Sequence, residues 1–71
     1  MNLKTKYGLV HVPSAHKCRQ WAREVRRNLA AGLPPEHAGL QAARRVFPYE
    51  AREHYPPDAV SVEAILAGIA D

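Results

Sequence analysis

A stripe of apolar residues between Ser14 and Gly32 constrains the fold more than any other feature of this chain. Its members recur at the three- and four-residue spacing of one helix face. They are Cys18, Trp21, Ala22, Val25 and Leu29. Ser14 is a suitable N-cap, and Gly32 suits the position just beyond a helix C-terminus. The pattern therefore predicts an amphipathic helix over residues 14–31.

A second helix is predicted from the prolines that flank it. Pro35 suits the first turn of a helix over residues 35–46, and Pro48 prevents that helix from continuing. This helix carries Gly39 and Ala43, two small residues four positions apart. Small side chains at this spacing would let another helix approach closely.

A third helix, over residues 59–70, is predicted from the most hydrophobic stripe of the chain. The stripe comprises Ala59, Val62, Ile65, Leu66 and Ile69. Asp58 is a suitable cap for this helix, and Ser61 offers an alternative start. Between the second and third helices, residues 48–54 have room for a short helical turn. The Tyr-Pro-Pro sequence at residues 55–57 is then expected to be extended.

The N-terminal residues show a different pattern. Residues 3–12 alternate loosely between apolar and polar and contain Thr, Tyr and Val, which is typical of a strand. No second strand is predicted for it to pair with, so we expect residues 1–13 to form an extended or single-strand arm. The predicted fold is mostly α: a small three-helix bundle, residues 14–71, with this arm at its N-terminus. The predicted core consists of Trp21, Val25, Leu29, Leu40, Val46, Phe47, Val62, Ile65, Leu66 and Ile69.

The order of a short strand, a proline and two helices joined near a glycine resembles that of the ribbon-helix-helix repressors. The resemblance covers residues 4–46 and implies a DNA-binding dimer, although a helix over residues 59–70 has no place in that family. The sequence GLPPEHAGLQAARRVF also resembles the turn and second helix of a helix-turn-helix. Two prolines in that turn depart from the pattern, and we assign the chain to neither family.

Size and cysteine content indicate where such a chain can work. At 71 residues it has room for one domain, and Cys18 is its only cysteine, so no internal disulfide can stabilise it. This composition suits a reducing compartment. The sequence contains no signal-peptide pattern and no apolar run of membrane-spanning length. We therefore expect a cytoplasmic protein that is complete in itself.

Residues that could carry chemistry do not form a recognisable catalytic motif. Cys18, near a helix N-terminus and beside arginines, would have a lowered pKa, but His16 lies two positions away and faces another side of the helix. The four histidines do not have the spacing of zinc ligands. Glu50 and Glu53 flank Arg52 on a polar stretch and are expected to be solvated. We predict that the protein is not an enzyme and holds no cofactor or metal.

Charge is distributed unevenly along the chain, although the net charge is only +3. Residues 1–45 contain nine of the ten Lys and Arg residues, whereas residues 46–71 contain one cation and five acidic residues. Such asymmetry indicates either an electrostatic partner or attraction between the two halves.

The basic residues of the two central helices form the predicted binding surface. They are Lys17, Arg19, Arg23, Arg26, Arg27, Arg44 and Arg45, and Lys4, Lys6 and Tyr7 are candidate contacts on the arm. Arg19, Arg23 and Arg26 share one flank of the first helix. Arginine favours planar, bidentate pairing, which phosphate and carboxylate satisfy equally well. Two partners therefore stay open, nucleic acid and an acidic protein, beside the alternative that these arginines form only a solvated helix face.

These features favour a small non-enzymatic regulatory protein. We expect its basic helix face to bind an acidic surface of a nucleic-acid machine, such as RNA polymerase or a host defence complex, and to modulate or inhibit it. Short basic chains of this kind are typical of the accessory proteins of phages and mobile elements. One alternative is a direct DNA-binding transcriptional regulator that acts as a dimer. Another is a structural module that self-associates through Gly39 and Ala43.

Overall fold

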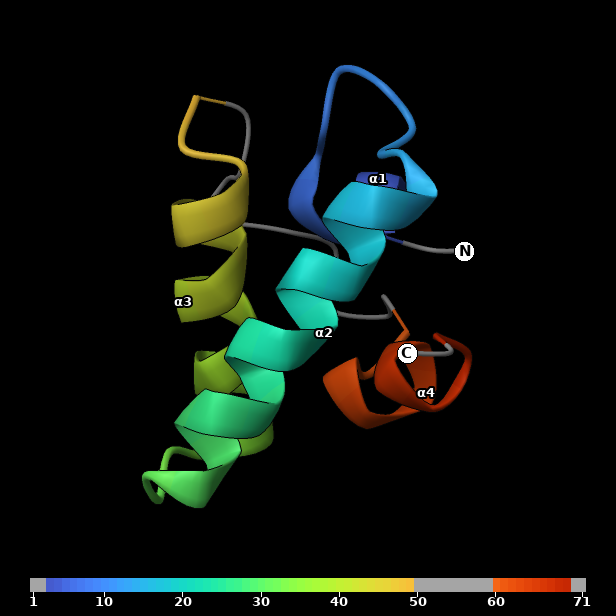
Figure 1. Cartoon of the computed structure of the whole chain (residues 1–71). Helices are drawn as coiled ribbons and strands as arrows, with labels where there is room; N and C mark the ends of the chain where they lie inside the picture. The colour runs from blue at the N-terminus through green and yellow to red at the C-terminus, as the bar shows by residue number, and fades with distance from the viewer. Residues whose placement is uncertain (1–2, 50–59, 70–71) are drawn as a thin grey trace.

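The predicted central helix is present, and its apolar stripe is buried. Helix α2 spans Ala15–Ala30 in the computed structural model of the chain, which describes residues 3–49 and 60–69 (Figure 1). Ser14 is its N-cap, and the Ser14 hydroxyl accepts a hydrogen bond of 3.2 Å from the backbone N–H of Lys17. Cys18, Trp21, Ala22 and Val25 are buried, and Leu29 packs against them. Gly32 follows the helix with φ +96°, a conformation that favours glycine, as its position predicts.

Helix α3 spans Pro35–Val46 and lies beside α2 (Figure 1). Its first helical residue is a proline, as predicted. Two side chains of α2 donate hydrogen bonds to backbone carbonyls of α3. Trp21 Nε1 lies 3.1 Å from the Gly39 oxygen, and Asn28 Nδ2 lies 3.1 Å from the Ala38 oxygen. The two longest described helices are therefore joined by buried apolar contact and by specific hydrogen bonds.

Residues 3–7 form a helix, so the prediction of a strand or an extended arm is wrong for them. This helix, α1, spans Leu3–Tyr7. Leu3 and Tyr7 lie four positions apart and are completely buried, and the Tyr7 ring centroid is 6.3 Å from that of Trp21. A five-residue helix is not stable alone, so its burial against the core explains why these residues are helical. With a helix in place of the strand, the element order no longer matches that of ribbon-helix-helix repressors.

Helix α4 spans Val62–Ala67 and is shorter than the predicted helix over residues 59–70. Ser61, the alternative start, is its N-cap and accepts a hydrogen bond of 3.2 Å from the N–H of Ala64. The proposed cap Asp58, most of the predicted turn at 48–54 and the Tyr-Pro-Pro sequence lie outside the described residues. Apart from Ala59, which also lies outside them, the predicted stripe packs into or against the core: Val62, Ile65 and Ile69 are buried, and Leu66 is partly buried.

The predicted core is largely confirmed and is larger than expected. Trp21, Val25, Phe47, Val62, Ile65 and Ile69 are buried, while Leu29, Leu40, Val46 and Leu66 pack against it in part. The structure adds Leu3, Tyr7, Leu9, Ala38, Ala42 and Ala43 to the buried set. The N-terminal residues thus share one core with the three predicted helices.

Gly39 brings three helices together. A Cβ atom added at Gly39 would lie 2.4 Å from Cγ2 of Val62 and 2.6 Å from the hydroxyl oxygen of Tyr7. The prediction that Gly39 and Ala43 allow close approach is therefore confirmed for Gly39, but the approaching elements belong to the same chain. Both residues are buried, so the prediction that they form a surface for self-association is wrong.

Lys6 connects α1 to α3 and to the chain just before α4. Its Nζ lies 2.8 Å from Oε1 of Glu36, and it donates a hydrogen bond of 2.8 Å to the carbonyl oxygen of Val60. The second oxygen of Glu36 accepts a 2.9 Å hydrogen bond from the N–H of Val62. Lys6 and Tyr7 are candidate partner contacts in the prediction of an N-terminal arm. That prediction is wrong, because both side chains are buried in the protein itself.

Replacing Gly39 by alanine should destabilise the fold. The added methyl group would overlap Val62 and Tyr7, and we expect the free energy of unfolding to fall by about 1 to 2 kcal/mol despite the higher helix propensity of alanine. Urea unfolding measures the change. Gly68→Ala is the control, because its Cβ would lie 3.5 Å from the Ile65 oxygen, an ordinary contact. Equal stability of the two variants would contradict the close packing at Gly39.

Candidate binding surface

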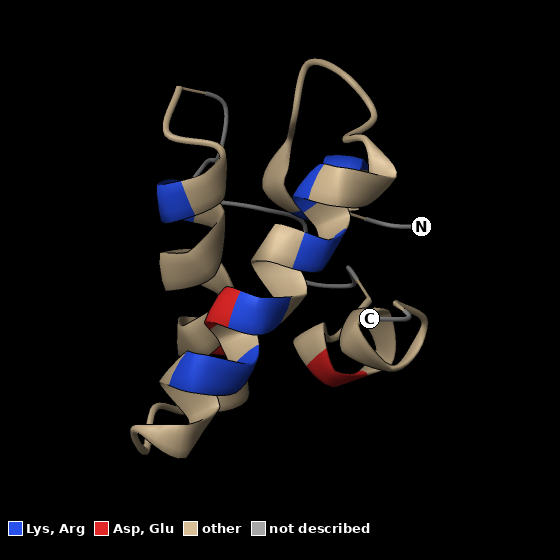
Figure 2. Ribbon diagram, viewed as in Figure 1, with Lys and Arg blue, Asp and Glu red and all other residues tan. Residues whose placement is uncertain are grey.

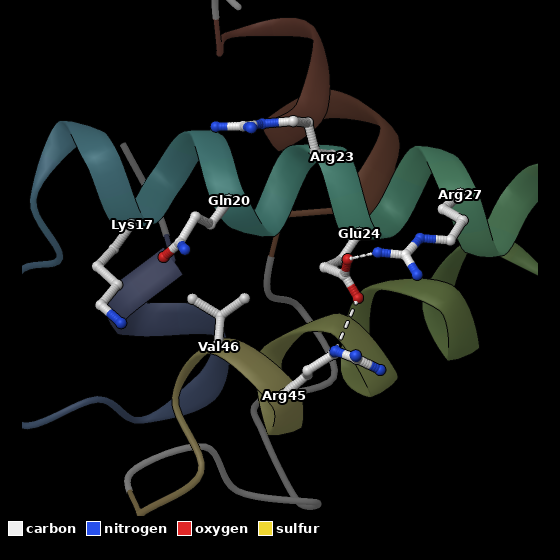
Figure 3. A pocket seen from close by; sticks show the side chains of 7 residues that line it. All are labelled: Lys17, Gln20, Arg23, Glu24, Arg27, Arg45 and Val46. Atoms are coloured by element: carbon white, nitrogen blue, oxygen red, sulfur yellow. Dashed lines mark hydrogen bonds and ion pairs between the residues drawn. The ribbon is translucent and has the colours of Figure 1, made fainter.

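An open cleft between α2 and α3 gathers four of the predicted cations (Figure 3). Its volume is about 360 Å³. We call it the α2–α3 cleft, and it is lined by Lys17, Gln20, Arg23, Glu24, Arg27, Arg45 and Val46. Four of these side chains are cationic and one is anionic, so the lining carries a strong excess of positive charge.

A carboxylate already lies between two arginines in this cleft. Glu24 of α2 pairs with Nη2 of Arg27 on the same helix, and its Oε1 lies 3.2 Å from Nε of Arg45 on α3 (Figure 3). The Glu24 side chain is only 15% exposed, whereas those of Arg27 and Arg45 are 67% and 71% exposed. A guanidinium has five N–H donors, so each arginine keeps donors for a further anion. Glu24 therefore positions two arginines from different helices without covering them.

The other cleft residues lie around this group. Lys17 and Gln20 extend from α2 towards Val46, whereas Arg23 leaves α2 on the side away from Arg45 (Figure 3). Lys17 and Arg23 are both exposed. Lys17, Arg27 and Arg45 thus lie on the side of α2 that faces α3, and Arg23 lies on the opposite side of that helix (Figure 3).

The remaining predicted cations lie beside the cleft or on another side of the molecule. Arg44 borders a neighbouring hollow of about 310 Å³ that Glu24 and Arg45 also line. Arg19 and Arg26 lie on the other flank of α2 with Arg23, where Arg19 is exposed and Arg26 is half-buried. Figure 2 shows basic positions along much of α2. Lys4 on α1 is exposed but does not line the cleft.

An apolar groove adjoins the cleft, and the sequence analysis missed it. Its volume is about 520 Å³. Its lining residues are His11, Val12, Pro13, Lys17, Val46, Phe47, Pro48 and Tyr49. Lys17 and Val46 line both the groove and the cleft. The available signal was the pair of Val-Pro and Phe-Pro-Tyr sequences, which place apolar side chains outside the regular helix stripes.

Cys18 is buried in the core and does not have the reactive character considered from the sequence. Burial raises the pKa of the Cys18 thiol, and the positive charge of nearby Arg19 offsets that effect only in part. The thiol sulfur lies 3.9 Å from the carbonyl oxygen of Pro13. A buried thiol with a raised pKa is a poor nucleophile at neutral pH.

Within residues 3–49 and 60–69, no three His, Cys, Asp or Glu side chains are grouped so that they could hold a metal ion. His54 lies outside these residues. None of the helices in the described part of the chain combines the length and apolar character needed to span a membrane.

Comparisons of the chain with protein-family models, with curated proteins and with solved structures each found no match. The candidate surface therefore rests on the position and chemistry of its own residues.

Replacing Glu24 by glutamine should strengthen the binding of polyanions. Among the described residues that line the cleft, the change removes the one carboxylate and leaves the four cations in place. We expect affinity for heparin to rise roughly two- to five-fold, because a flexible polyanion does not depend on the ordering of Arg27 and Arg45 by Glu24. The stability change should stay within about 1 kcal/mol, because both arginine partners of Glu24 are largely exposed. Glu63→Gln on α4 is the control, because it changes the net charge equally at an exposed position. Equal gains in the two variants would show that net charge, rather than the cleft, governs binding.

Proposed function

We propose that this chain is a small regulatory protein that binds an acidic surface of a nucleic-acid-processing complex through the α2–α3 cleft. The observation that carries the proposal is the placement of the Glu24 carboxylate between Arg27 and Arg45. Two exposed arginines from different helices are held in position to receive a second carboxylate. Ordering these side chains before binding lowers the entropic cost of association.

An acidic protein fits the surface better than nucleic acid does, because cations and apolar side chains adjoin there. Carboxylates of a partner can pair with the arginines of the cleft, and its apolar side chains can contact Val12, Val46 and Tyr49. The phosphates of a nucleic-acid backbone can pair with the arginines but cannot use the apolar side chains. Burial of Cys18 removes this thiol as a candidate nucleophile. By covering the acidic surface of the complex, the protein would modulate or inhibit that complex.

Direct DNA binding is the second candidate function. It is favoured by Arg19 and Arg23, two exposed arginines that lie about one helical turn apart on α2. Of these, Arg23 points away from Arg45 (Figure 3). Arginines in a row can contact successive phosphates of a nucleic-acid backbone. This candidate predicts a steep loss of affinity with salt, whereas protein recognition through the apolar groove would be less sensitive to salt.

Affinity capture from a nuclease-treated lysate of the source cells tests the proposal. We expect the wild-type chain to retain an identified nucleic-acid-processing complex. The double variant Lys17→Glu and Arg45→Glu should reduce capture roughly ten-fold or more, because it reverses two charges of the cleft. The double variant Lys4→Glu and Arg19→Glu changes the net charge equally outside the cleft and should retain capture.

Loss of the complex on nuclease treatment would contradict the proposal. So would an equal loss of capture in both double variants. Anisotropy measurements with duplex DNA at increasing salt test the second candidate. A log–log slope near about minus four or steeper would favour direct DNA binding, since each neutralised phosphate contributes roughly minus 0.9.

A further inference from the structure

The apolar groove is built by two segments that are distant in the sequence. Residues 11–13 belong to the loop between α1 and α2, and residues 46–49 form the end of α3 and the turn after it. Both segments lie at the same end of the α2–α3 pair (Figure 1). The groove volume of about 520 Å³ falls within the roughly 300 to 1,000 Å³ of typical ligand sites.

The side chains of the groove include large apolar groups that the core does not use. Tyr49 is 98% exposed and Val12 is 68% exposed, whereas Phe47, which also lines the groove, is buried. Exposed aromatic side chains beside an apolar depression are characteristic of protein contact sites. Tyr49 and Val12 contribute little to the packing of the fold and are therefore available for contact with a partner.

The positive charge at the end of the groove that adjoins the cleft indicates which chemical groups that partner carries. Lys17 and Val46 belong to both linings, so a ligand that lies in the groove continues into the α2–α3 cleft. There it meets Lys17, Arg23, Arg27 and Arg45, against which Glu24 is the single carboxylate that the described part of the chain adds to the lining. An apolar residue followed by acidic residues would match this surface at both ends.

We propose that the groove and the cleft together form the docking site for a segment of an acidic protein, in which bulky apolar residues are followed directly by Asp or Glu residues. The apolar residues lie against Val12, Phe47 and Tyr49. The carboxylates that follow them pair with Lys17 and the cleft arginines. This inference rests on the proposed function and specifies the partner segment that the same surface recognises.

Fluorescence anisotropy with synthetic peptides tests the docking site. The first probe contains a Phe-Leu pair followed by a run of glutamates. In the second probe serines replace Phe and Leu, and in the third lysines replace the glutamates. We expect the first probe to bind roughly ten-fold more tightly than the second, because only the first buries apolar surface in the groove. The third probe should not bind.

A double variant and a control variant test whether the difference in affinity between the first two probes arises from the groove. Combining Val12→Ser with Tyr49→Ser should lower the affinity of the first probe to that of the second, while leaving the second unchanged. Val10→Ser is the matched control, because Val10 is 65% exposed and does not line the groove. It should leave the binding of both probes unaltered.

The outcomes separate this inference from the proposed function. If both acidic probes bind equally through the cleft, the docking segment is wrong and the proposed function stands. If neither acidic probe binds, both proposals fail. If the lysine probe binds as well as the first, or if sedimentation shows a dimer that the combined groove variant dissociates, the acidic segment is not the occupant and the inference is overturned.

Discussion

The arrangement of the two short helices depends on one contact, that of the Glu36 carboxylate with groups of α1 and α4. One of its oxygens pairs with the buried ammonium of Lys6 in α1, and the other accepts the N–H of Val62 at the start of α4. A lysine buried without an anion would destabilise the fold strongly. The first N–H groups of a helix also need acceptors from outside the helix. A single side chain of α3 therefore satisfies polar groups from two elements that are too short to be stable alone.

This contact also determines which surfaces of the molecule stay open. It holds α1 and α4 over Gly39, where the absence of a side chain leaves room for Tyr7 and Val62. Other residues of α2 and α3, most of them charged, line the cleft around Glu24. Core packing and the candidate binding surface thus use different faces of the same two helices. This division allows Arg27 and Arg45 to be ordered by Glu24 while remaining exposed.

The sequence predicted the elements whose signals are local. Helices α2 and α3 follow from apolar periodicity and from Ser14 and Pro35 at their starts. Helix α1 could not be predicted in this way, because it has only five residues and is stabilised by burial of its side chains among distant helices. The basic residues were likewise visible in the sequence, but the pairing of Arg45 with Glu24 depends on how α2 packs on α3. The apolar groove joins two segments that are distant in the sequence, so the short apolar sequences within each segment do not show that they lie together.

A double-mutant cycle on Lys6 and Glu36 tests this account most directly. Urea unfolding of wild type, Lys6→Met, Glu36→Gln and the double variant measures the coupling free energy between the two side chains. Because Lys6 is buried against this carboxylate, we expect each single change to be destabilising and the coupling to be about 1 kcal/mol or more. Additive effects, with a coupling near zero, would contradict the claim that this contact holds α1 and α4 in place.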